Sequence, residues 1–132
     1  MPLEYRLLQF EKVSSLIAII GAVLLYISAS KAQVIEIEQA QGIQTNSTEI
    51  SPSQITAIAE RILLIGRTLS AIIAKTRLKE REQQVILGKN TAASLEPNIL
   101  INNGHWIVVL GTIIIAIGTQ KRANQGAQIT IV

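Results

Sequence analysis

The sequence contains no cysteine and no aspartate, and only one histidine among 132 residues. Without cysteine the chain has no disulfide, thiolate nucleophile or cysteine-ligated metal. A lone His105 beside an apolar block is more typical of an interfacial polar residue than of a metal ligand or base. Serine is plentiful, but no G-x-S-x-G or S-x-x-K motif and no phosphate-binding glycine loop occurs. We therefore predict a protein that is not an enzyme and holds no metal or cofactor.

Aromatic residues are also scarce, at 3% of the chain, although 48% of its residues are hydrophobic. Soluble cores of this size normally rely on aromatic side chains, which bury the most area. Here the apolar residues are mainly aliphatic and gathered in blocks, and the mean hydropathy is +0.39. This pattern favours a membrane protein. The mild net charge of +3, with no aromatic stacking platform, argues against nucleic-acid binding.

The first block, residues 13–30, has no charged residue and is bounded by Lys12 and Lys31. A helix of this length rises about 27 Å, close to the roughly 30 Å of a hydrocarbon core. We predict a transmembrane helix here, which Leu3–Phe10 can extend.

A cleavable signal peptide is the alternative for this block, because Ser28-Ala29-Ser30 resembles a cleavage site. The block is longer than the usual apolar region of about 7–15 residues, and Glu4 and Glu11 dilute the basic region before it. An uncleaved anchor is therefore favoured.

The second block, residues 105–120, rises only about 24 Å and is short for a span. Either the segment from Asn98 adds a turn at its entry, or the bilayer thins around the protein. Trp106 stands where an interfacial aromatic anchor belongs. We predict a second transmembrane helix here.

Small residues recur at helical spacing in both blocks, and they let helix backbones approach closely in lipid. In the first block the stripe includes Ser15 and Leu25, and in the second it includes Gly104. The residues predicted to pack membrane helices are Ala18, Ala22, Ala29, Gly111 and Gly118.

Basic residues near the outer ends of the two blocks predict the topology. Arg6, Lys12, Lys121 and Arg122 lie on the terminal sides. The positive-inside rule therefore predicts that residues 1–12 and 121–132 are cytoplasmic, and that the central segment, residues 31–104, lies outside.

The first part of the central segment, residues 32–52, is polar and is predicted to be a loop. Within it, Val34–Glu38 alternates and can form a short strand or extend the first helix. Asn46-Ser47-Thr48 matches a glycosylation sequon, which is common by chance.

Residues 53–87 predict a long amphipathic helix, opened by Ser51-Pro52 as N-cap and first position and closed by Gly88. Apolar side chains step by three and four residues along it, as in a coiled coil. The predicted helix-packing seam consists of Ile55, Ile58, Ile62, Ile65, Leu69 and Ile72. Isoleucine at both seam positions favours trimers or tetramers over dimers.

A third span is the alternative for this helix, but Glu60, Arg61 and Arg67 oppose it, since a central charge costs about 2.5–3.5 kcal/mol on insertion scales. Beyond the seam, residues 75–82 carry mixed charges. They can bind anionic headgroups, although an exposed helix end is the simpler interpretation.

The sequence thus predicts an all-α integral membrane protein with two transmembrane helices and a long amphipathic central helix. The leading functional hypothesis is a structural or accessory subunit of a membrane complex, or a homo-oligomer, assembled through helix packing. Its expected partners are the lipid bilayer and either further copies of the chain or a larger membrane protein. The alternatives are a holin-like pore former and a small regulator of a membrane enzyme or transporter.

Overall fold

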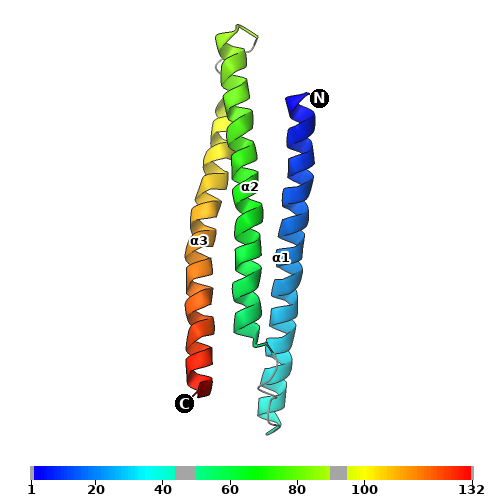
Figure 1. The fold of residues 1–132 in the computed structure, drawn as a ribbon, viewed down its shortest axis with the longest axis vertical. Helices are drawn as coiled ribbons and strands as arrows, with labels where there is room; N and C mark the ends of the chain where they lie inside the picture. The colour runs from blue at the N-terminus through cyan, green and yellow to red at the C-terminus, as the bar shows by residue number, and fades with distance from the viewer. Residues whose placement is uncertain (1, 44–49, 90–94, 132) are drawn as a thin grey trace.

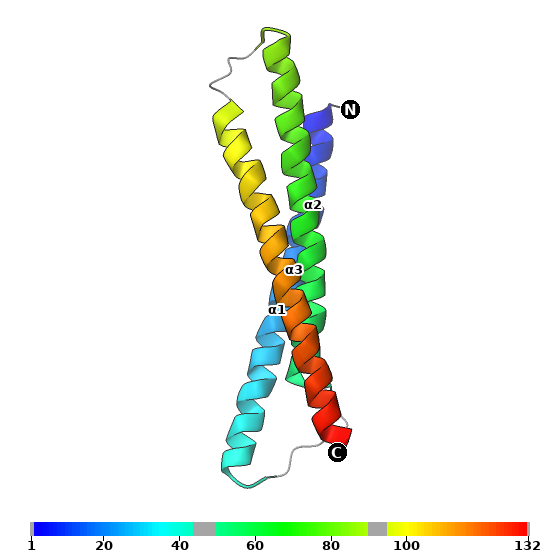
Figure 2. The ribbon, with the colours of Figure 1, turned by 90° about the vertical axis from the view of Figure 1, so that its left-hand side faces the viewer.

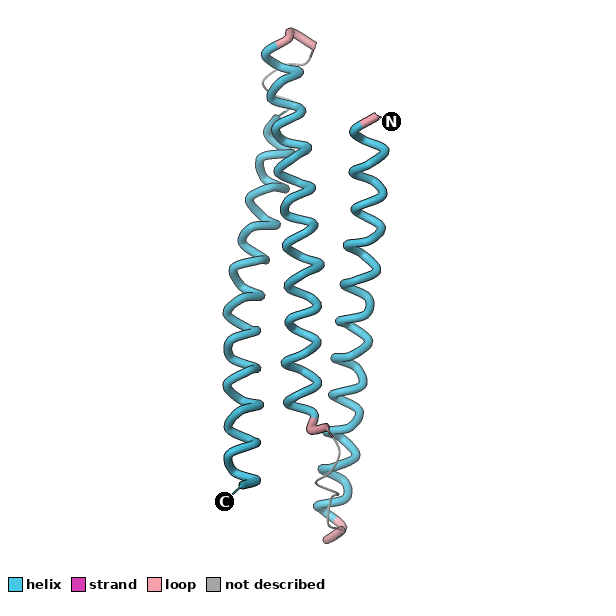
Figure 3. The backbone as a smooth tube through the Cα atoms, viewed as in Figure 1, coloured by secondary structure: helices cyan, strands magenta, loops and turns pink. Residues whose placement is uncertain are grey.

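In a computed structural model the protein consists of three long helices, and no strand occurs among residues 2–43, 50–89 and 95–131, which the structure describes. Side chains are described as far as Gly126. The helices are α1 (Leu3–Ala40), α2 (Pro52–Ile86) and α3 (Glu96–Ile131), shown in Figure 1 and as a tube in Figure 3. The predicted all-α class and the long central helix are confirmed. The sequon at Asn46 lies outside the described residues.

Local sequence signals explain where α2 begins and where α1 and α2 end. The Ser51 side chain accepts a hydrogen bond from the backbone N–H of Gln54, and the Gln54 side chain accepts one from the N–H of Ser51, so a capping box opens α2. Gly42 and Gly88 follow the ends of α1 and α2, both with φ of +75°, the left-handed conformation that suits glycine. The expected roles of Ser51 and Gly88 are confirmed.

The two outer helices are longer than the apolar blocks inside them. α1 continues through Val34–Glu38 to Ala40, so this segment extends the helix and is not a strand, and much of the predicted loop 32–52 is helical. Neither Pro nor Gly stands between Gly21 and Gly42 to end the helix earlier. α3 begins at Glu96, so Asn98 does add helix ahead of the second block.

α2 lies between the other two helices and packs along both, whereas α1 and α3 do not pack on each other in the described part of the chain. The outer helices run in the same direction, so the N- and C-termini lie at opposite ends (Figure 1). The outer helices lean in opposite directions when the molecule is turned by 90° (Figure 2). The prediction that both termini lie on one side of a bilayer stays a prediction.

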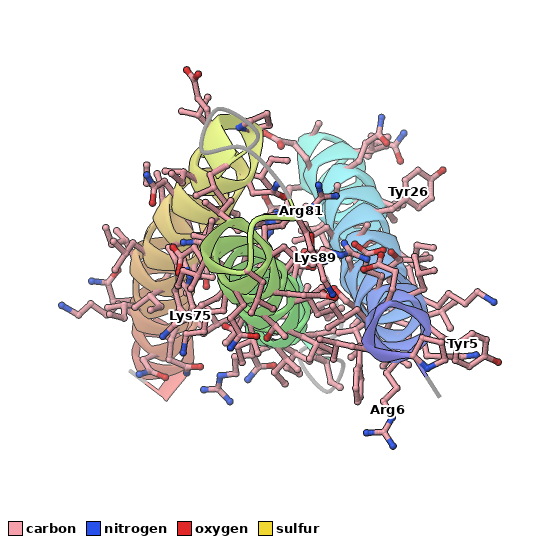
Figure 4. All side chains as sticks on the ribbon, turned by 90° about the horizontal axis from the view of Figure 1, so that it is seen from above. Tyr5, Arg6, Tyr26, Lys75, Arg81 and Lys89 are labelled. Carbon is pink, nitrogen blue, oxygen red and sulfur yellow. The ribbon has the colours of Figure 1, made fainter. Side chains whose placement is uncertain are left out.

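By length and composition, α1 and α3 can each cross a membrane. They are not core helices, because only 17% and 11% of the residues in their most apolar windows are buried. Large apolar side chains instead point outward, as Tyr26 does in Figure 4. The helix contacts hold alanines together with a few larger aliphatic side chains such as Leu7, Leu63 and Ile73. The buried polar or charged residues are Ser14, Ser28, Glu60 and Thr112.

Candidate functional site

The contact between α1 and α2 is built on a strict seven-residue repeat. The buried residues of α1 are Leu7, Ser14, Gly21 and Ser28. Residues seven apart return to nearly the same side of a helix, so these four form one narrow stripe. The stripe faces α2 along most of the length of α1 and fixes how the two helices pair.

Two members of the stripe make the same hydrogen-bonded contact with α2, fourteen residues apart. The Ser14 hydroxyl donates to the carbonyl of Gly66 at 2.9 Å and also contacts the Ser70 hydroxyl. The Ser28 hydroxyl donates to the carbonyl of Pro52 at 2.7 Å and lies 2.6 Å from the Thr56 hydroxyl. Because a serine has one hydroxyl proton, the second hydroxyl must be the donor in each pair. We call these two contacts the serine clamps.

Two glycines allow the helices to approach closely: Gly21 lies between the clamps, and Gly66 belongs to the clamp of Ser14. A Cβ at Gly21 would stand 2.7 Å from Cγ of Leu63, so Leu63 fits into the space that Gly21 leaves. A Cβ at Gly66 would stand 3.2 Å from the carbonyl oxygen of Ser14. This is the close packing through small residues that holds helices together in lipid.

An ion-pair cluster joins the same helices toward the N-terminal end of α1. The Arg77 guanidinium donates to Glu11 and, at 3.0 Å, to Glu4. These hydrogen bonds, chiefly the one to Glu11, raise the pKa of Arg77 above its ordinary value. The cluster is partly exposed and therefore contributes little stability, of the order of 1 kcal/mol or less.

Charged residues of α2 also reach α3. Arg67 donates to the Thr112 hydroxyl at 2.7 Å, and that hydroxyl donates to the carbonyl of Val108 at 2.7 Å. Arg61 donates to the Gln120 side chain. The two arginines are thereby held by neutral polar groups of α3, and they fix an antiparallel register between α2 and α3.

Glu60 is the most unusual side chain in this contact. It is 8% exposed, and its Oε2 is buried without a hydrogen-bond partner among the described residues. The register set by the pairs Arg61–Gln120 and Arg67–Thr112 places Glu60 close to the turn of α3 around Thr119. A buried carboxyl oxygen without a hydrogen-bond partner is costly to the fold.

Gly66 of α2 contacts α1, and the next residue, Arg67, contacts α3. One helical step is a rotation of about 100°, so the two contact faces of α2 meet at an angle. The three helices therefore form an open V with α2 at its corner, in agreement with the view from above in Figure 4.

Two cavities of about 290 Å³ open inside this V, each lined by all three helices. One lies at the clamp of Ser28 and includes Ser53, Thr119 and Arg122. The other lies toward the N-terminal end of α1 and includes Glu11, Arg77 and His105. Its Arg77 and Glu11 are already paired within the chain, whereas Arg122 forms no ion pair with the described residues.

The predicted isoleucine seam lies mostly on the outside of α2. Ile58, Ile65 and Ile72 are 46%, 60% and 49% exposed. Ile62 and Leu69 are half-buried, and Ile55 is buried at one end. The three exposed seam residues, Ile58, Ile65 and Ile72, present an apolar surface, here called the isoleucine face. Its role in assembly stays a prediction.

The predicted small-residue stripes lie beside the contacts that the fold uses. Ala18 is half-buried, whereas Ala22 and Ala29 are exposed, and Ala29 lines the cavity at the clamp of Ser28. Gly111 and Gly118 face open space, since a Cβ at either would meet nothing within 4 Å. Whether these residues pack against another helix stays a prediction.

Sequence reasoning missed Ser14, Gly21 and Ser28, which stand one position before the predicted alanine stripe of α1. Their spacing of seven was the signal that could have found them. Trp106 is half-buried, and its Nε1 donates to Asn102 at 3.2 Å, which ties the predicted interfacial anchor to its own helix.

Among the described residues no group of His and Glu side chains could hold a metal ion. No family model matches the chain, and no curated protein or solved structure is detectably similar to it.

Proposed function

We propose that this protein is a membrane-embedded assembly subunit whose three helices all cross the bilayer and whose isoleucine face binds further copies of the chain. The observation that carries the proposal is the inverted distribution of side chains. Polar residues such as Ser14 and Thr112 are buried at helix contacts, while large aliphatic residues such as Ile114, 70% exposed, point outward. Hydrocarbon around the molecule is the solvent that makes this distribution favourable.

α2 crosses with the outer helices because it packs along both of them. Its arginines find polar partners in this position, since the half-buried Arg67 and the exposed Arg61 are hydrogen-bonded to Thr112 and Gln120. Charged residues inside membranes normally face the interior of a bundle and find polar partners there. On this proposal the apolar isoleucine face of α2 meets lipid or protein.

The charges assign the orientation of the three crossings. At the end that holds the N-terminus and the α2–α3 connection, the basic residues are Arg6, Lys12, Lys75, Arg77, Lys79, Arg81 and Lys89. At the other end they are Lys31, Lys121 and Arg122. The positive-inside rule then places the N-terminus in the cytoplasm, as predicted, and the C-terminus on the opposite side.

Self-assembly is favoured because the exposed isoleucines of this face recur every seven residues, the repeat of a coiled coil, on a helix that already has α1 and α3 beside it. β-Branched side chains at that spacing interlock with an identical face. In lipid the gain comes from dispersion and shape complementarity rather than from removal of water.

The mass of the purified protein in detergent micelles tests this assembly. We expect a multiple of the 14.3 kDa chain. Replacing Ile58, Ile65 and Ile72 together by alanine removes the interlocking side chains, so it should return the protein to a single chain. The matched control replaces Ile107, Ile114 and Ile117, which are at least as exposed on α3 as these three are on α2.

Three results would contradict the proposal. A single chain in the unmodified protein would refute self-assembly, and equal dissociation by both triple variants would show that the isoleucine face is not special. A complex containing a different, larger protein would instead identify an accessory subunit.

A further inference from the structure

We propose that the cavity between α1, α2 and α3 at the N-terminal end of α2 binds the phosphate group of an anionic lipid, with Arg122 as the residue that contacts it. The inference rests on the proposed membrane crossing and adds a binding site with a defined ligand class. It concerns the cavity of about 290 Å³ that includes Ser28, Ala29, Ser53, Thr56, Thr119 and Arg122.

The charge of this cavity selects an anion. Among its described lining residues Arg122 is the one ionisable group. No hydrogen bond or ion pair within the described chain occupies its guanidinium. A guanidinium donates two parallel hydrogen bonds to phosphate oxygens, so it recognises phosphate by geometry as well as by charge.

The hydroxyl groups around Arg122 have separate tasks. Ser28 donates to the carbonyl of Pro52 and accepts a hydrogen bond from Thr56, so these two side chains hold the wall of the cavity in place. Thr119 donates to the carbonyl of Ala116. The Ser53 hydroxyl forms no hydrogen bond within the described part of the chain and can donate to a phosphate oxygen.

The other cavity that all three helices line has a different balance of charge. In that cavity the Arg77 guanidinium is engaged by Glu11 and Glu4, which leaves an excess of negative charge. An anionic headgroup would be repelled there. The two cavities are alike in volume, so their charges decide between them.

The depth of the site fits a lipid rather than a soluble phosphate. Arg122 follows the end of the second apolar block, and Ser28 lies near the end of the first. Both positions are at the level where lipid headgroups lie. Toward the membrane centre the cavity continues to Leu25, whose apolar side chain can contact the start of an acyl chain.

Native mass spectrometry of the full chain from mixed micelles tests the site, with phosphatidylglycerol and phosphatidylcholine as the two lipids. We expect the unmodified protein to retain phosphatidylglycerol preferentially. Arg122→Gln should weaken this retention by about tenfold or more, because a charge-assisted bidentate contact is lost. The matched control is Lys121→Gln, which removes the same charge from the neighbouring position, outside the cavity.

A second variant, Ala29→Leu, fills the cavity from α1 while it keeps Arg122, and it should also weaken retention. The site is refuted if both lipids are retained equally, or if Lys121→Gln and Arg122→Gln act alike, since general surface charge would then explain binding. Displacement of phosphatidylglycerol by inorganic phosphate at equal concentration would refute the lipid as ligand.

Flotation of the same protein with lipid vesicles separates this inference from the proposed function. Failure to float would contradict membrane crossing itself. Stable flotation without a preference for phosphatidylglycerol would contradict the lipid site alone.

Discussion

At the scale of single residues, the fit of Leu63 against Gly21 decides how near α1 comes to α2. A Cβ at Gly21 would stand within 2.8 Å of both Cγ and Cδ2 of Leu63, so a larger residue there would force Leu63 or the helix to move. The glycines of α3 differ, since Gly111 faces open space. Glycines of the same type therefore have opposite significance in the two outer helices.

We expect Gly21→Ala to lower the free energy of unfolding by about 1–3 kcal/mol, the usual cost of overpacking a tight contact. Gly111→Ala, the control, should leave it unchanged or raise it by up to about 1 kcal/mol, since alanine is the better helix former. Unfolding of each variant in mixed micelles, followed by circular dichroism, measures the difference. Equal effects of the two substitutions would show that Gly21 is not in a close contact.

At the scale of helices, the pairing of α1 with α2 depends on a register rather than on a core of large side chains. Ser14 lies opposite Ser70, Gly21 opposite Leu63, and Ser28 opposite Thr56. A slip by one residue would turn the hydroxyls of both clamps away from their acceptors. The clamps thus specify one pairing of two helices whose remaining surfaces are nearly uniform and aliphatic.

Removing a clamp should weaken this pairing measurably. We expect Ser14→Ala and Ser28→Ala each to cost about 0.5–1.5 kcal/mol of unfolding free energy. The clamps are separated by about 21 Å of helix, so the double variant should show the sum of the two effects. Ser15→Ala, at the exposed neighbouring position, is the control. Thermal unfolding in micelles gives all four values, and an equal loss in the control would refute the role of the clamps.

At the scale of the whole molecule, the direction of α3 relative to α1 determines the topology. Because the two outer helices run parallel, a bilayer crossed by both in this arrangement is also crossed by α2. The connection after α1 and the connection after α2 then lie on opposite sides. In the two-span topology that the flanking charges predict, both connections lie on the same side.

The absence of cysteine makes this difference directly measurable. Single variants Gln41→Cys and Lys89→Cys place one thiol in each connection. In sealed, uniformly oriented vesicles, a membrane-impermeant maleimide added outside should label one variant and not the other until the vesicles are opened. Labelling of both variants from the same side would contradict three crossings and restore the two-span topology.

The sequence alone determined the all-α class, the cap at Ser51 and the end of α2 at Gly88, because these features depend on local hydrogen bonding and backbone preference. It also located both apolar blocks, since a charge-free aliphatic run is a property of the chain itself. It placed the boundaries of α1 and α3 less well, because the polar turns beyond each block continue the helix although the hydropathy falls there.

Tertiary structure decided which face of each helix is used. On α1, the stripe through Ser14, Gly21 and Ser28 and the stripe through Ser15, Ala22 and Ala29 are both small, and only the partner side chains of α2 distinguish them. On α2, the isoleucines have the most regular spacing, yet the contacts formed with α1 and α3 use Gly66 and Arg67. The physical reason is that small and hydrogen-bonding side chains gain most from direct helix contact, whereas aliphatic ones lose nothing by facing outward in lipid.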